Sequence, residues 1–251
     1  MQAAAHTDIG RIRSHNEDIV FCTTNPTGPL PNLFVVADGM GGHNAGEVAS
    51  AESLKYSCDF LRSSQVPAPV GPEGAMKLLV ESVENANMGV YAQSLTSQDL
   101  KGMGTTFSAC TVLGDTLAVA HVGDSRIYII NSGHITQITT DHTYVAEMVK
   151  AGHITPEDAK THPNRNQLTR VLGYEPEIQV EGILYSLGME DCVLLCSDGL
   201  TDMLTDEEIM DIVCTPSLPQ IRAQALIDAA NTNGGVDNIS AIIIDIKGEI
   251  N

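Results

Sequence analysis

Short apolar runs bounded by Gly, Asp, Asn or Pro recur along the chain and predict β-strands. They are rich in Val, Ile, Thr and Cys, and the predicted strands cover residues 18–23, 33–37, 105–113, 116–122, 126–131, 178–186, 191–197 and 239–246. Gly114-Asp115 predicts a hairpin turn between two of these strands. The segment from Asn131 to His134 predicts another hairpin, which leads into residues 135–138. Consecutive hairpins indicate antiparallel pairing.

Apolar residues at helical spacing mark a second set of segments. The predicted helices in this set cover residues 44–64, 73–100, 206–213 and 218–231. Asn44 and Glu47 have capping-box spacing at the start of the first, although the box prefers Ser or Thr. Thr205 and Glu208 have the same spacing before 206–213, and Ser217 is the predicted cap of the last helix.

Strands interrupted by helical blocks predict an α+β fold, with sheets packed on each other and helices outside. Residues 140–175 break the pattern: they predict a short helix over 143–151, another opened by Thr155-Pro156, and then an irregular polar loop. We interpret this segment as a surface insertion, or flap. Such a segment either lines an active site or simply connects two strands, and the sequence favours neither.

The chain has 251 residues, enough to bury a sizeable core. Its hydrophobic content of 43% and charged content of 18% are ordinary for a globular protein. The formal net charge of -19, from 13 Lys and Arg against 32 Asp and Glu, is not ordinary. Phosphate-rich surfaces repel such a chain, so we expect it to bind neither nucleic acid nor membrane.

The six cysteines include no Cys-x-x-Cys pair, and several lie within apolar runs. Cys192 and Cys196 lie on one extended strand, too far apart for an easy bridge. We therefore expect buried free thiols in a reducing compartment. The N-terminal segment lacks the pattern of a signal peptide, and no apolar stretch approaches the ~20 residues of a membrane helix. These features predict a soluble, cytoplasmic protein.

Five aspartates stand beside glycine, asparagine or another acid: Asp18, Asp38, Asp124, Asp198 and Asp237. Asp38 and Asp198 directly or almost directly follow buried strands, and each is followed by glycine. A strand end gives an acid rigid support, and glycine leaves the backbone open beside it. Acids that converge repel one another unless a cation neutralises them, and hard divalent metals choose such oxygen ligands. The pattern predicts a metal site built from distant strand ends.

Each motif also has a simpler explanation. Arg13 is a candidate phosphate clamp, since its planar fork matches two phosphate oxygens, but taken alone the segment favours a surface ion pair of Arg13 with Glu17 or Asp18. Asp38-Gly39 can be a tight turn and Asp124 an Asx turn. His43 is a candidate proton-transfer group or merely a residue at a helix start.

Several other chemistries lack their sequence patterns. Met40-Gly41-Gly42 fits neither a Rossmann fingerprint nor a P-loop lysine motif. The chain contains no His-Glu-x-x-His or zinc-spaced Cys/His cluster, and no Gly-x-Ser-x-Gly nucleophile elbow. These absences disfavour nucleotide cradling, structural zinc and serine hydrolysis.

The order of the motifs is that of one family: Arg13-x-x-Asn16-Glu17-Asp18, Asp38-Gly39-Met40-Gly41-Gly42-His43, Gly102-Met103-Gly104-Thr105-Thr106, Gly123-Asp124-Ser125-Arg126, Ser197-Asp198-Gly199-Leu200 and Asp237-Asn238-Ile239-Ser240. The chain resembles a bacterial member of the metal-dependent protein serine/threonine phosphatases, the PPM or type-2C family. The resemblance runs from about residue 5 to residue 246, and as a set the motifs are highly specific.

The resemblance implies a single catalytic domain over residues 1–251, with two antiparallel sheets packed as a four-layer αββα sandwich and residues 140–175 as the flap. It implies two core ions, Mn2+ or Mg2+. Asp38 would bridge both and the Gly39 carbonyl would bind one. The remaining implied metal ligands are Asp198 and Asp237 on the other ion, Glu17 or Asp18 through water, and Asp124 with Asp198 on a weaker third ion.

The resemblance also implies that Arg13 binds the phosphate of phosphoserine or phosphothreonine in a protein. A hydroxide held between two cations can attack phosphorus in line while the metals and Arg13 neutralise the developing charge, without a phospho-enzyme. Met40 occupies a position that is often histidine in animal members, so metal-bound water or His43 would protonate the leaving group.

By family analogy the protein is expected to act on proteins phosphorylated by a Hanks-type kinase. Nothing in the sequence suggests more than a monomer. A pseudo-phosphatase, which binds a phosphoprotein or metal without turnover, is the alternative. The complete set of acids disfavours it.

Overall fold

The computed structural model describes residues 1–42, 45–68, 70–131 and 133–246. Its strands are β1 (Gln2–Asp8), β2 (Asp18–Thr23), β3 (Leu33–Met40), β4 (Gly104–Thr105), β5 (Phe107–Leu113), β6 (Thr116–Val122), β7 (Arg126–Asn131), β8 (His134–Gln137), β9 (Glu181–Ser186), β10 (Cys192–Cys196) and β11 (Ile239–Asp245). Its helices are α1 (Ala45–Ser63), α2 (Pro72–Ser94), α3 (Tyr144–Lys150), α4 (Pro156–Thr161), α5 (Asp198–Thr201), α6 (Asp206–Val213) and α7 (Pro219–Thr232), with a 3-10 turn at Gln98–Leu100.

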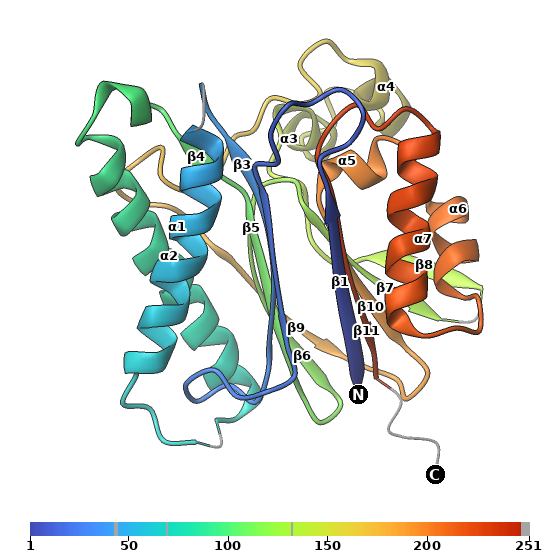
Figure 1. The fold of residues 1–251 in the computed structure, drawn as a ribbon, viewed down its shortest axis with the longest axis horizontal. Coiled ribbons are helices and arrows are strands. Elements are labelled where there is room, and N and C mark those ends of the chain that lie inside the picture. Colours follow the sequence, from blue (N-terminus) through green and yellow to red (C-terminus); the bar gives the residue numbers. More distant parts are fainter. Residues whose placement is uncertain (43–44, 69, 132, 247–251) are drawn as a thin grey trace.

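Two antiparallel sheets form the centre of the molecule (Figure 1). Within the described residues, sheet 1 has the order β1-β11-β10-β7-β8, and sheet 2 has the order β2-β3-β5-β6-β9 with β4 paired to β3. Helices α1 and α2 cover the outer face of sheet 2, and α6 and α7 cover that of sheet 1. The expected αββα sandwich is confirmed.

Strands buried on both faces explain why the sequence shows continuous apolar runs rather than alternation. In β3, Val35 and Ala37 pack toward α1 and α2, whereas Phe34 and Val36 pack between the sheets. In β11, Ile243 packs toward the helices of the other side, and neighbouring residues of the strand fill the core between the sheets. A strand end in this sandwich therefore places alternate side chains in the space between the sheets.

Several predicted local features are confirmed. The β5–β6 hairpin pairs Leu113 with Thr116, and Gly114 in its turn has φ +61°. Helix α6 begins at the predicted capping box of Thr205 and Glu208, in which each side chain bonds the other's backbone. The predicted flap helices are α3 and α4.

Other predictions are wrong. The strand list omitted β1, because Gln2–Asp8 is dominated by alanine and pairing with β11 decides its conformation. Helix α2 ends at Ser94 instead of residue 100, and 178–180 do not join β9. Ser217 is not the cap of α7: the cap is Leu218, and the fixed φ of Pro219 starts the helix. The predicted cap Asn44 lies outside the described residues.

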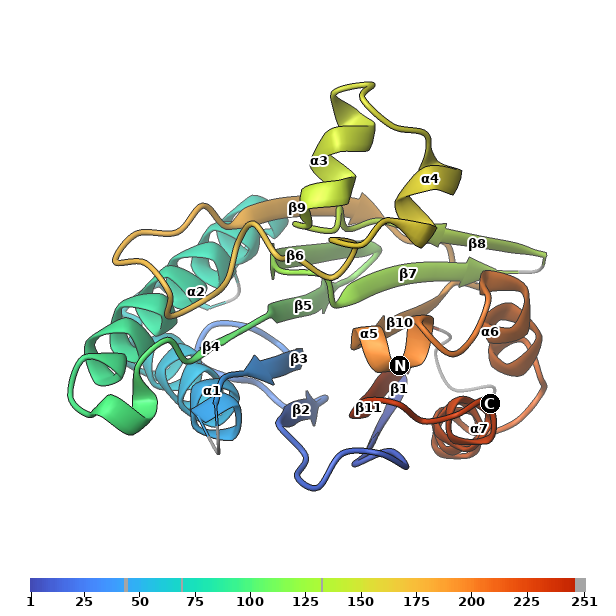
Figure 2. The same ribbon diagram turned by 90° about the horizontal axis from the view of Figure 1, so that it is seen from above.

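The flap, residues 140–175, projects from one edge of the sandwich with α3 and α4 (Figure 2). It lies at the same end of the sheets as α5 (Figure 1). Among the described residues, all six cysteines are free thiols, as expected, but only four are buried: Cys22 is half-buried and Cys214, beyond the end of α6, is exposed. No helix among the residues that the structure describes combines the length and the apolar character needed to cross a membrane.

Candidate active site

Asp38 lies near the end of β3, on the face of sheet 2 that packs against sheet 1. Its orientation follows from alternation, since Phe34 and Val36 lie in the core between the sheets. The Asp38 N–H donates to Thr106 Oγ1 at 2.9 Å, and the Thr105 hydroxyl donates to the Asp38 carbonyl at 2.8 Å. The strand and these bonds hold the Asp38 carboxyl at one end of the space between the sheets.

Asp18 begins β2 and is the direct cross-strand partner of Asp38. Its side chain is buried, and Oδ2 accepts hydrogen bonds from the hydroxyls of Ser197 at 2.8 Å and Ser240 at 2.7 Å. Its other oxygen, Oδ1, has no partner. Burial, together with repulsion from neighbouring acids, raises the pKa of Asp18 to about 7. Asp18 therefore links sheet 2 to the serines of the sheet 1 side.

Two further acids come from sheet 1. Asp198 is the first residue of α5, just beyond β10, and Asp237 precedes β11, the neighbouring strand. A Cβ on Gly199 would collide with the Asn238 carbonyl, so the two segments approach this closely only with glycine at 199. Burial, followed by repulsion from Asp237, raises the pKa of Asp198 to about 6. Asp198 Oδ1 is buried without a partner.

The electrostatics connect these acids into one group. Burial raises the pKa of Asp38 well above its usual value, and four negative charges add to the rise: Asp18, Asp198, Asp124 and Asp237. Burial and the charge of Asp198 raise the pKa of Asp124 to about 8. The five aspartates singled out from the sequence thus lie in mutual electrostatic contact.

Glu17 lies in a close contact of three segments. Its carbonyl accepts hydrogen bonds from the Gly39 N–H at 3.1 Å and the Ser50 hydroxyl at 2.6 Å. A Cβ on Gly39 would collide with the Gly46 carbonyl, so glycine lets α1 approach β3 here. Burial raises the pKa of Glu17, and Oε1 is buried without a partner. Like Asp18, Glu17 offers a free carboxylate oxygen, so both stay candidates as metal ligands.

Arg13 lies at the rim of these acids. Its guanidinium donates to Asp237 Oδ2 at 2.7 Å, and 48% of its side chain is exposed. The partner is Asp237, not the Glu17 or Asp18 of the simple ion-pair explanation. An exposed guanidinium at the edge of a metal site can exchange this contact for a phosphate. His43, the other predicted catalytic residue, lies outside the described residues.

Sequence reasoning missed the residues that support the acids. Asn238 belongs to one of the sequence motifs, but its supporting role was not predicted. Its side chain accepts from the Glu17 N–H and donates to the Ile9 and His15 carbonyls, each at 2.9 Å. It fastens the loop that carries Arg13 to the start of β11. The sequence feature that could have indicated this role is the position of Asn238 directly after Asp237. In the same way, Ser197 stands directly before Asp198.

Six residues make up what we call the acid cluster: Glu17, Asp18, Asp38, Asp124, Asp198 and Asp237. Three of its buried oxygens, Glu17 Oε1, Asp18 Oδ1 and Asp198 Oδ1, have no hydrogen-bond partner among the described residues. Burying unpartnered carboxylates that repel one another is costly. Mg2+ and Mn2+ take hard oxygen ligands of this kind and would neutralise the charge. The residues present therefore fit divalent metal ions.

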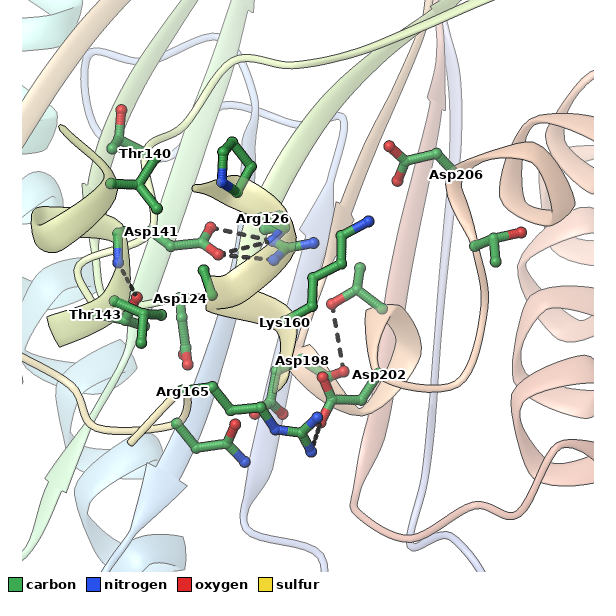
Figure 3. A pocket seen from close by; sticks show the side chains of 18 of the residues that line it. Asp124, Arg126, Thr140, Asp141, Thr143, Lys160, Arg165, Asp198, Asp202 and Asp206 are labelled. Atoms are coloured by element: carbon green, nitrogen blue, oxygen red, sulfur yellow. Dashed lines mark hydrogen bonds and ion pairs between the residues drawn. The ribbon is translucent and has the colours of Figure 1, made fainter. Parts of the chain in front are cut away.

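A pocket of about 1140 Å³ adjoins the cluster, lined by Asp124 and Asp198 together with residues of the flap and of α5 and α6 (Figure 3). Lys160 and Arg165 reach it from the flap, and Arg165 pairs with Asp202 at 3.7 Å. Of the two explanations of the flap, a segment that lines the site is therefore supported over a plain connection.

Comparison with known proteins gives concordant results. The sequence profile of the family described as Protein phosphatase 2C matches residues 11–231. The serine/threonine phosphatase stp of Listeria welshimeri is 36% identical over 245 residues, which cover 98% of this chain and 96% of that protein.

Two solved structures extend the likeness to the fold. Stp1 from Staphylococcus aureus, a serine/threonine phosphatase, has a TM-score of 0.90 at 36% identity, covering 98% of this chain and 95% of that one. The catalytic domain of the serine threonine protein phosphatase PstP, in complex with 2 manganese ions, has a TM-score of 0.84 at 34% identity, covering 98% of each chain.

Proposed function

The chain belongs to the protein phosphatase 2C family, and from this premise we propose that it is a Mn2+- or Mg2+-dependent phosphatase that dephosphorylates serine and threonine side chains of proteins. The relatives described above are named serine/threonine phosphatases, and the PstP catalytic domain binds manganese. The observation that carries the proposal is the acid cluster with its three unpartnered buried oxygens.

We assign the metal-holding roles as follows. Asp38 and the Gly39 carbonyl lie at the end of β3, Asp198 lies just beyond β10 and Asp237 just before β11. These four would hold two core ions. Asp18 or Glu17 would act on one of them through water. Asp124 with Asp198 would hold a third, weaker ion. When bound, such ions make hydroxide available from water near neutral pH and neutralise charge on the phosphoryl group.

The chain's own residues then do three things. Arg13 binds two oxygens of the substrate phosphate with its fork, in place of its contact with Asp237. Asn238 and the packed sheets hold Arg13 and the acids in fixed positions relative to one another. Catalysis therefore depends mainly on positioning and electrostatic stabilisation. His43 remains our candidate for protonating the leaving oxygen, alongside water.

The test is hydrolysis of a phosphothreonine peptide and of p-nitrophenyl phosphate, with Mn2+, with Mg2+ and with a chelator. Asp38→Asn should lower turnover far more than tenfold, since it removes one carboxylate of the central ligand. Asp211→Asn, an exposed change on α6, is the matched control. Less than a tenfold loss in Asp38→Asn would refute the assignment.

The pseudo-phosphatase is disfavoured because every predicted acid described by the structure lies in the cluster. Metal binding without turnover on either substrate would reinstate it.

We further propose that residues 1–251 act as one catalytic domain with residues 140–175 as its flap. The protein would oppose a Hanks-type serine/threonine kinase and work as a monomer in the cytoplasm. The bacterial relatives and the free thiols support this setting. Co-expression with such a kinase and loss of phosphorylation on its products test the pairing.

A further inference from the structure

One buried histidine, His142, organises the junction between the flap and the sandwich. It is 5% exposed and lies on the chain that enters the flap. The backbone N–H of His142 donates to the Gly123 carbonyl at 2.8 Å. The backbone carbonyl of His142 accepts from the N–H of Thr169, on the chain that leaves the flap, at 2.8 Å. His142 therefore joins both ends of the flap to the turn that precedes Asp124.

The imidazole of His142 adds a second bond to the same turn. The Gly123 N–H donates to Nδ1 at 3.1 Å. The other ring nitrogen, Nε2, lies 3.0 Å from Arg170 Nη1 and 3.9 Å from Glu181 Oε2. The ring also packs on His121, with centroids 4.8 Å apart. Burial, followed by the charges of His121 and Arg170, lowers the pKa of His142 to about 3, so the ring is neutral.

This group is better explained as a support than as a second metal site. The ligand atoms of His121, His142 and Glu181 lie within 4.8 Å of one another. However, both nitrogens of His121 already have protein partners, Ser108 Oγ at 2.8 Å and the Thr140 carbonyl at 3.2 Å. With one nitrogen of His142 bound to the main chain as well, a metal would have to break several of these bonds.

Gly123 is held from its other side by Thr106. It has φ +107°, and a Cβ there would lie 2.6 Å from the Thr106 side chain, so only glycine fits. Thr106 Oγ1 in turn accepts from the Asp38 N–H and lies 2.7 Å from the Ser125 hydroxyl. Gly123 thus sits between His142 and the residue that holds Asp38, and a shift of Gly123 would displace Asp124 relative to Asp38.

We propose that His142 is a positioning residue: it fixes Asp124 through Gly123, so that the seating of the flap determines how tightly Asp124 and Asp198 hold the third cation. The identity of that ion rests on the proposed function, whereas the contacts of His142 do not.

The experiment measures Mn2+ binding by titration calorimetry, together with kcat and KM, for the wild type, His142→Leu and His142→Asn. Asparagine places an acceptor oxygen near the position of Nδ1, whereas leucine has none. We expect His142→Leu to weaken the weakest Mn2+ site about tenfold, as loss of one buried hydrogen bond would, with the tight sites unchanged. We expect His142→Asn to restore most of the loss. His153→Leu, exposed on the flap, is the control and should bind Mn2+ normally.

A double-mutant cycle with Asp124→Asn tests the route. If His142 acts through Asp124, adding His142→Leu to Asp124→Asn changes Mn2+ binding no further. The same additional loss in both backgrounds, or equal weakening of all sites, overturns the proposal. Should His142→Leu fail to fold, His142→Gln replaces it, because its acceptor lies near Nε2 instead of Nδ1. Since Mn2+ binding needs no substrate, absence of turnover would refute the proposed function while this test still stands.

Discussion

Replacing Asn238 by alanine should detach the loop at residues 9–17 from the sandwich. The side chain makes three bonds to this loop: to the Glu17 N–H and to the carbonyls of Ile9 and His15. Each such bond contributes about 1 kcal/mol net, so the loop loses about 3 kcal/mol of local stability. That loss corresponds to a roughly hundredfold increase in the population of the open loop.

Hydrogen–deuterium exchange is the direct assay, because opening of the loop exposes its amides. We expect amides in residues 9–17 that are protected in the wild type to exchange about a hundredfold faster in Asn238→Ala. The loop carries Arg13, so KM for a phosphopeptide should rise as well. Asn25→Ala, an exposed change, is the control and should leave both quantities unchanged.

Exchange in this loop at the wild-type rate, with an unchanged KM, would refute the reasoning that Asn238 holds Arg13 in place. Faster exchange over the whole protein would instead show that Asn238 stabilises the fold at large.

Three further predictions concern the cluster. Arg13→Ala should raise KM for a phosphopeptide about tenfold or more, and Arg13→Lys should recover only part, because lysine lacks the bidentate fork; equal kinetics in both variants and the wild type would contradict this. Removing both hydroxyls in Ser197→Ala/Ser240→Ala should raise the pKa of Asp18 further and move the pH of half-maximal Mn2+ binding upward, whereas an unchanged binding profile would exclude the effect. In the metal-free protein, three cluster acids have folded pKa values of about 6 to about 8, above the ~3.9 of unfolded Asp. Their contribution to stability is therefore full below about pH 4 and is lost progressively as pH rises from about 4 through the folded pKa values of about 6 to about 8. The melting temperature should fall over this range and recover with Mn2+, and a rise without metal would overturn the assignment.

The fold was predictable where local and global signals agree. Buried strands such as Cys192–Cys196 show themselves as apolar runs, and the capping box at Thr205 marks the start of α6. Strand β1 was not predictable in this way, since its alanines favour no strand and its pairing with β11 spans almost the whole chain. Helix α5 has four residues, too few to show a helical period.

The candidate site likewise contains residues that the sequence predicts and supporting contacts that it does not. Asp38 and Asp198 stand beside glycine at strand ends, so their role as acids on rigid supports could be predicted. The bonds from Ser197 and Ser240 to Asp18 join residues 179 and 222 positions apart, and no local spacing reveals them. Such supporting contacts exist only once the two sheets have packed.

The most direct test of the metal centre is a crystal structure grown with Mn2+, read from the anomalous difference map. We expect two strong manganese peaks within coordination distance of Asp38, one also beside the Gly39 carbonyl and the other beside Asp198 and Asp237, with a weaker peak near Asp124. A map with no peak in the acid cluster, or with manganese only at His121 and His142, would contradict the assignment of this cluster as the phosphatase's metal centre.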